Sequence, residues 1–204
     1  MNNRIVLRSL VTSDGCLTAM DDGNIIWRPT HGSRQQTKLE SLATVLLAFK
    51  SSNNRINSIV IGDNRGGIIH LSIPSLEVIN IFSLEGESIR SICSASESTH
   101  RLLVACQSGS IWMVGDQVPS RKVHLFHNDG PVTSIRVGNN QEIHLQSGWQ
   151  RRVIDFTGCE LSYHDTSDKF KKKDEIRAIR RARLETQQYN SSYPTTITLD
   201  SVTA

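Results

Sequence analysis

The chain has 204 residues, of which 37% are hydrophobic and 5% aromatic, and its formal net charge is +3. This length allows one large β domain or two small ones, and the nearly balanced charge argues against nucleic-acid binding by the whole molecule. No run of about 18 apolar residues occurs, so we expect a soluble, cytoplasmic protein without membrane contact.

Turn residues recur at a fixed interval along the first three quarters of the chain. Gly23, Gly66, Gly109 and Arg151 each end a turn dipeptide that is followed by an apolar, β-branched run. These positions are 43, 43 and 42 residues apart. An interval of this length is typical of a repeat architecture in which each repeat is one supersecondary unit.

Side chains align in columns on both sides of these turns. The column two residues after the turn is apolar and β-branched: Ile25, Ile68, Ile111 and Val153. The column four residues before it is small: Ala19, Gly62, Ala105 and Ser147. The column six residues before it is apolar: Leu17, Val60, Leu103 and Leu145. Because residues two apart share one face of a strand, each repeat predicts a hairpin with one packed face.

Further strand-like runs surround the hairpins. One precedes each hairpin, at residues 5–10, 42–49, 89–94 and 132–137, and another follows two of them, at 76–84 and 121–127. Residues 31–38 are too polar to be predicted as a strand. Four strands in about 43 residues are typical of a propeller blade. The alternative, a generic β-sandwich, gives no reason for a small residue at a fixed period.

The repeats resemble the WD-repeat family over residues 4–164, most clearly in the stretch LLVACQSGSIW at 102–112. The resemblance implies an all-β, β-propeller-like array of about four four-stranded antiparallel blades that binds partners. No Trp-Asp pair ends a third strand and no Gly-His pair opens a repeat, so the family's buried hydrogen-bond network is not carried over to this chain. We therefore expect WD-like blades in residues 1–164 and a separate tail in residues 165–204.

The number of repeats does not decide whether the blades close into a ring. A four-bladed ring and an open arc are both consistent with the repeat number. An arc would leave two bare apolar blade faces, which a second copy in a homodimer or a partner's blades would complete. Residues 195–202 alternate like a strand and either close the last blade or form a loose terminus.

Binding is expected on the rim formed by the hairpin turns and the links between blades, because loops are less committed to packing than strands. The predicted partner-binding residues are Asp22, Arg65, Gln107, Asp129, Trp149 and Arg151. Trp149 combines with its arginine neighbours into a hot-spot composition for a protein partner. The alternative is that Trp149 folds back over a neighbouring blade as a lid.

The tail is locally basic. Between residues 169 and 183 there are eight basic and two acidic side chains. The basic ones are Lys169, Lys171, Lys172, Lys173, Arg177, Arg180, Arg181 and Arg183. Without interleaved aromatics this run predicts at most a weak, salt-sensitive contact with nucleic-acid phosphates. The alternative is a solvated helix or a disordered tail with no binding role.

No catalytic residue, metal site or cofactor is predicted. The four cysteines are too widely spaced for a zinc or redox motif, and we expect free, mostly buried thiols. His124 and His127 are three apart in an expected strand and so should point to opposite faces. The glycine-rich loop at 62–67 lacks the Lys-Ser/Thr ending of a phosphate loop and precedes a strand. The leading hypothesis is a non-enzymatic protein-interaction scaffold, and the alternative is a nucleic-acid-associated protein that binds through its tail.

Overall fold

The computed structural model describes residues 5–95, 101–167 and 176–178 of the chain. The chain divides into two compact units, residues 1–164 and 165–204, which are considered separately. Within the described residues, no helix is both long enough and apolar enough to span a membrane.

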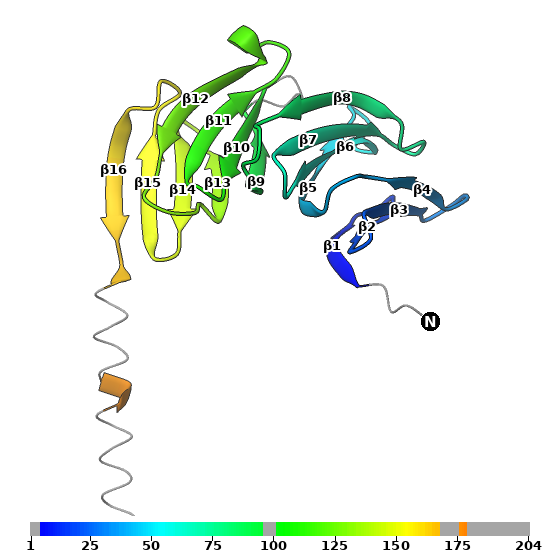
Figure 1. Ribbon diagram of the computed structural model, residues 1–204, viewed down its shortest axis with the longest axis horizontal. Coiled ribbons are helices and arrows are strands. Elements are labelled where there is room, and N and C mark those ends of the chain that lie inside the picture. Colours follow the sequence, from blue (N-terminus) through cyan, green and yellow to red (C-terminus); the bar gives the residue numbers. More distant parts are fainter. Residues whose placement is uncertain (1–4, 96–100, 168–175, 179–204) are drawn as a thin grey trace, which may run out of the picture. The chain divides into compact units, whose positions relative to one another are not determined.

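The described part of the first unit consists of four antiparallel sheets of four strands each, which follow one another in chain order (Figure 1). The first sheet contains β1 (Val6–Val11), β2 (Gly15–Met20), β3 (Asn24–Pro29) and β4 (Gln35–Lys38). The second contains β5 (Ala43–Lys50), β6 (Ile56–Asp63), β7 (Gly67–Ser72) and β8 (Val78–Ser83). The third contains β9 (Ile89–Ser94), β10 (Leu102–Cys106), β11 (Ser110–Val114) and, after the short 3-10 turn η1 (Pro119–Arg121), β12 (Lys122–His127). The fourth contains β13 (Ser134–Val137), β14 (Ile143–Ser147), β15 (Gln150–Ile154) and β16 (Glu160–Asp165).

The expectation of an all-β unit built from four four-stranded sheets is confirmed, with one local correction. Residues 31–38 were not expected to contain a strand, yet β4 pairs with β3 between Asn24↔Lys38 and Trp27↔Gln35. β4 lies at the edge of its sheet and most of its side chains are exposed, so a polar composition is no obstacle there. The fourth position of the last sheet is filled by β16, and residues 195–202 lie outside the described residues.

Apolar layers join each sheet to the next. The layer between the first and second sheets includes Leu17 and Ile59, and the layer between the second and third includes Val60 and Leu102. A third layer joins Leu103 of the third sheet to the fourth sheet. The first strands of successive sheets also contact one another, β1 with β5, β5 with β9 and β9 with β13. Each inner sheet is therefore covered by apolar contacts on both faces.

The column of small residues lies within these layers in the first three sheets. Ala19 and Ala105 are fully buried. At Gly62, a Cβ atom would lie 2.6 Å from Cγ2 of Ile89 in the third sheet and 2.6 Å from Cγ1 of Val45 in its own sheet. The periodic small residue therefore exists because neighbouring sheets approach closely at that pleat position.

The fourth repeat departs from the predicted columns by one residue. Its hairpin turn is Gly148–Trp149, closed by the pair Ser147↔Gln150, whereas the first three hairpins have three-residue turns. Leu145 consequently packs against the third sheet, although its column partners Leu17, Val60 and Leu103 pack against the following sheet. A shift of one residue reverses which face of the sheet each side chain points to. In the sequence this shift is visible as the interval of 42 residues, in place of 43, between the third and fourth turns.

Candidate partner-binding surface

The hairpin turns and the links between sheets meet along one edge, which we call the rim. In each of the first three repeats a link amide donates to the carbonyl of the turn glycine. The bonds run from Leu39 to Gly23 (2.9 Å), from Leu84 to Gly66 (2.9 Å) and from Asn128 to Gly109 (3.0 Å). The rim thus comprises turns 21–23, 64–66, 107–109 and 148–149 together with links 39–42, 84–88 and 128–133.

Glycine is required at the first three turns because of this contact. Gly23, Gly66 and Gly109 have φ values of 81°, 89° and 99°, in the left-handed region that side chains disfavour. At Gly109 a Cβ atom would also collide with the carbonyl oxygen of Asn128. By contrast, nothing lies within 4 Å of a Cβ built at Gly148 in the fourth turn. The backbone therefore holds three of the four turns in place.

Four of the predicted binding residues lie in the turns and links of the rim, along with Trp149. Asp22 is half-buried and accepts a hydrogen bond from the Asn24 amide at 3.1 Å, while Arg65 and Gln107 are exposed in the second and third turns. Asp129 is exposed in the last link. Rim side chains therefore reach solvent at several turns.

Trp149 is the largest apolar side chain on the rim. Its side chain is 54% exposed. The neighbouring hydroxyl of Ser147 donates to the carbonyl of Pro131 at 2.8 Å, which fixes this turn beside the last link. A lid over a neighbouring sheet would be largely covered, so the exposure of Trp149 favours the binding alternative.

The other end of the rim is acidic. A shallow depression of about 510 Å³ lies between the first turn and the first link, and its lining includes Asp21, Asp22 and Glu40 beside Lys38. In the described part of the chain, no group of three or more His, Cys, Asp or Glu side chains is arranged to hold a metal ion.

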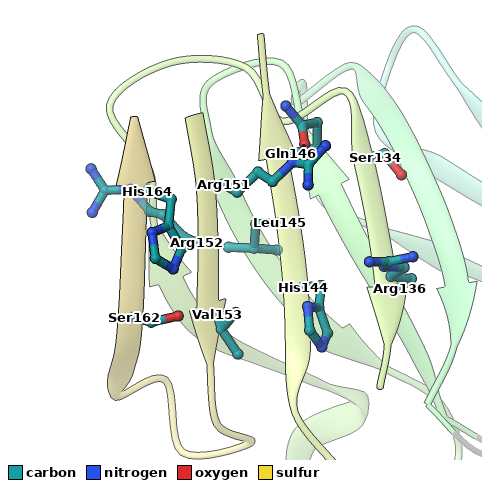
Figure 2. A pocket seen from close by; sticks show the side chains of 10 residues that line it. All are labelled: Ser134, Arg136, His144, Leu145, Gln146, Arg151, Arg152, Val153, Ser162 and His164. Atoms are coloured by element: carbon teal, nitrogen blue, oxygen red, sulfur yellow. Dashed lines mark hydrogen bonds between the residues drawn. The ribbon is translucent and has the colours of Figure 1, made fainter. Parts of the chain in front are cut away.

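The fourth sheet turns one face away from the third sheet, and we call it the open face (Figure 2). A depression of about 640 Å³ covers it, lined by Ser134, Arg136, His144, Leu145, Gln146, Arg151, Arg152, Val153, Ser162 and His164. The expectation that a bare face at the end of the array would be apolar is therefore wrong for this sheet. The reason is the one-residue shift, which turns Ile143 and Leu145 inward and leaves His144 and Gln146 outside.

Arg151 belongs to this face and not to the turn in which it was predicted. It lies in β15, and its Nε donates to Oε1 of Gln146 on β14 at 3.0 Å. Arg136 on β13 is also exposed, across β14 from Arg151 (Figure 2). Among the residues that the structure describes, no carboxylate lines the depression, and Glu142, 3.7 Å from Nε2 of His144, lies beside that ring outside the lining. The open face is therefore cationic.

Arg152 has a different role, because it connects the third and fourth sheets. Its guanidinium lies 4.4 Å from the ring centre of Tyr163 on β16 and 5.9 Å from that of Phe126 on β12. It also pairs with Glu160 and, at 3.8 Å, with Asp129. These two carboxylates compensate its charge, so the positive charge of the open face comes mainly from Arg136 and Arg151.

The histidines of β12 lie differently from the prediction. His124 pairs with Trp112 and His127 with Ser110, and a bulge between these pairs adds one residue to β12. Cross-strand partners share a face, so the two rings lie on the same side of the sheet and not on opposite sides. His124 packs edge-on against Trp112 with ring centres 4.9 Å apart. This histidine therefore has a packing role.

Two of the four cysteines are poor nucleophiles in the folded chain. All four are free, as the sequence indicated, but the expectation that most are buried is wrong, because only Cys106 is buried, Cys16 and Cys93 are half-buried and Cys159 is exposed. Burial raises the pKa of Cys93 to about 12, and burial followed by the neighbouring Glu87 also raises the pKa of Cys106. Both thiols are therefore protonated at neutral pH.

The basic tail is described only in part. Residues 176–178 are helical and exposed, and they include Arg177. The other seven basic residues, Lys169, Lys171, Lys172, Lys173, Arg180, Arg181 and Arg183, lie outside the described residues.

Comparison with known proteins gives a fold likeness alone. No family model matches the chain, and no curated protein matches it. Among solved structures, the computationally designed protein Ika8 is similar, with a TM-score of 0.59 at 14% sequence identity. The match covers 77% of this chain and 48% of Ika8, so the chain spans about half the length of that protein.

Proposed function

We propose that this chain is a non-catalytic, cytoplasmic interaction module, built from divergent WD-like propeller blades, that binds a protein partner along its rim. The observation that carries the proposal is the exposed Trp149 on a turn that shares one edge with three backbone-fixed turns. Preformed turns lose little conformational entropy on binding, and an exposed tryptophan contributes a large contact area.

The sheet arrangement supports the propeller part of the proposal. Each sheet packs on the next in chain order, their first strands are adjacent, and a small residue recurs in each of the first three layers. In such an array the strands are occupied by packing, and the rim offers side chains for recognition. The four free cysteines are compatible with the reducing cytoplasm.

The test is quantitative affinity purification with the full chain carrying Trp149→Ala, followed by mass spectrometry. We expect the variant to lose specific partners while it keeps the urea midpoint of the unmodified chain. The matched control is Leu161→Ala, which removes an apolar side chain of similar exposure (52%) from β16 of the same sheet. Equal partner loss in both variants, or none in Trp149→Ala, would contradict binding through the rim.

The basic run in residues 169–183 supports a second candidate, nucleic-acid association through the tail. Replacing Lys169, Lys171, Lys172 and Lys173 by glutamine tests it without shortening β16, which extends to Asp165. Loss of all partner binding in this variant would indicate that the tail is the main binding element, whereas retained protein binding would indicate that the rim is. A nucleic-acid affinity that did not weaken with rising salt would contradict a phosphate contact.

A further inference from the structure

We infer that the open face of the fourth sheet is a second interaction surface, and that it binds an extended, acidic segment of a partner protein. This inference does not depend on the rim, because the face and the turns are different surfaces of the sheet. It rests on three observations: the broken apolar pattern of the face, its charge and its dimensions.

The first observation is that the open face does not continue the apolar layers between sheets. In the third sheet the face toward the following sheet carries Leu103, Ala105 and Ile111, all fully buried. The corresponding face of the fourth sheet instead carries Arg136, His144, Gln146 and Arg151. Covering it with another apolar sheet would bury two arginines without a carboxylate to compensate their charge, which is strongly unfavourable.

The second observation concerns the charge that a partner must bring. Arg136 and Arg151 approach the depression from β13 and β15, and no Asp or Glu is among its lining residues. A second copy stacking head-to-tail does not supply the missing charge. The outward face of the first sheet carries Arg28 and Lys38 next to Cys16 and Asn24, their cross-strand partners. That contact would set Arg28 against further cations, and the carboxylates of Asp21, Asp22 and Glu40 beside Lys38 lie at the rim, so an acidic partner is favoured over self-association.

The third observation is the width of the face. Four strands about 4.8 Å apart span roughly 15 Å, which an extended chain of about five residues crosses. The depression is open and shallow, and the serine hydroxyls of Ser134 and Ser162 lie at its two sides. Carboxylates spaced along an extended segment can reach both arginines, and Gln146 already orients the guanidinium of Arg151 at 3.0 Å.

The experiment uses the full chain and a fluorescently labelled, glutamate-rich peptide of about ten residues, long enough to cross the sheet. Fluorescence anisotropy should show binding that weakens as salt rises. The double variant Arg136→Gln, Arg151→Gln should weaken it about ten-fold, because each removes one exposed charge contact. The urea midpoint of each variant verifies that the fold is retained.

Two matched variants locate the binding. Lys50→Gln with Arg55→Gln removes the same charge from exposed positions of the second sheet away from the rim and should leave peptide affinity unchanged. Lys171→Gln with Lys172→Gln removes two charges from the tail and should also leave peptide affinity unchanged. If either matched variant abolishes binding while the open-face variant does not, the inference is overturned.

A labelled single-stranded RNA of the same charge distinguishes the partner class. We expect it to bind more weakly than the peptide, or to respond to the tail variant and not to the open-face variant. RNA binding that is tighter than peptide binding and depends on Arg136 and Arg151 would overturn the protein-partner assignment. Sedimentation of the unmodified chain as a dimer that the open-face variant dissociates would overturn it in favour of self-association.

Discussion

Adding one methyl group at Gly62 tests whether the second and third sheets are stacked as described. A Cβ there would lie 2.6 Å from Cγ2 and 2.9 Å from Cβ of Ile89, and 2.6 Å from Cγ1 of Val45. Overpacking of a closed layer costs about 1–3 kcal/mol, and reduced freedom of the unfolded chain offsets about 0.4–1 kcal/mol. We therefore expect Gly62→Ala to lower the free energy of unfolding by about 1–2 kcal/mol, as measured by urea denaturation.

A double-mutant cycle assigns this cost to the contact between sheets. Ile89 is fully buried, and Ile89→Ala alone should cost about 2–5 kcal/mol. Because it removes the methyl group that Gly62→Ala would meet, the double variant should be more stable than additivity predicts by about 0.5–1 kcal/mol. Ile111→Ala, in the next layer, is the control and should combine additively with Gly62→Ala. A neutral Gly62→Ala, or strict additivity with Ile89→Ala, would refute the stacking argument.

Three further predictions concern single side chains. Gly109→Ala should cost about 2–4 kcal/mol from left-handed backbone strain and the collision with the link, whereas Gly148→Ala, with open space around it, should cost about 1 kcal/mol; equal urea midpoints would contradict this. Arg152→Met should cost about 1–3 kcal/mol, and less in high salt, because two ion pairs and two ring contacts are lost; a salt-independent cost would assign its role to packing alone. At pH 8, iodoacetamide should label the exposed Cys159 well before Cys93, whose pKa is about 12, and early labelling of Cys93 would refute its burial. Because this pKa is raised above its unfolded value of 9.0, the contribution of Cys93 to stability should be intact below pH 9 and decline as pH rises toward 12.

The sequence predicted those parts of the fold that depend on a strict period. The turn glycines Gly23, Gly66 and Gly109 are necessary because each contacts the link to the next strand, and a contact of that kind recurs wherever the repeat recurs. The polar strand β4 was not predicted from the sequence, because an edge strand is stabilised by backbone pairing and needs no apolar face.

The candidate site was predicted less completely, for a related reason. The exposed Trp149 could be found from its place in a turn. The open face could not, because the predicted columns placed Leu145 and Val153 on one face of the hairpin. The turn shorter by one residue turns Leu145 toward the third sheet and leaves Val153 on the opposite, open face. Only the alternation of Arg136, His144 and Gln146 with Ile135, Ile143 and Leu145 indicated the correct faces, and it competes with the repeat pattern.

Methyl-to-methyl nuclear Overhauser effects between the third and fourth sheets test the central physical claim, which is that apolar contacts join consecutive sheets and leave a cationic face at the fourth. In protein with labelled isoleucine, leucine and valine methyl groups, Leu145 should show cross-peaks to Leu103 or Ile111, since all three are buried in one layer. Val153, on the open face, should show none to the third sheet. Cross-peaks from Val153 to Leu103 or Ile111, with none from Leu145, would contradict the claim.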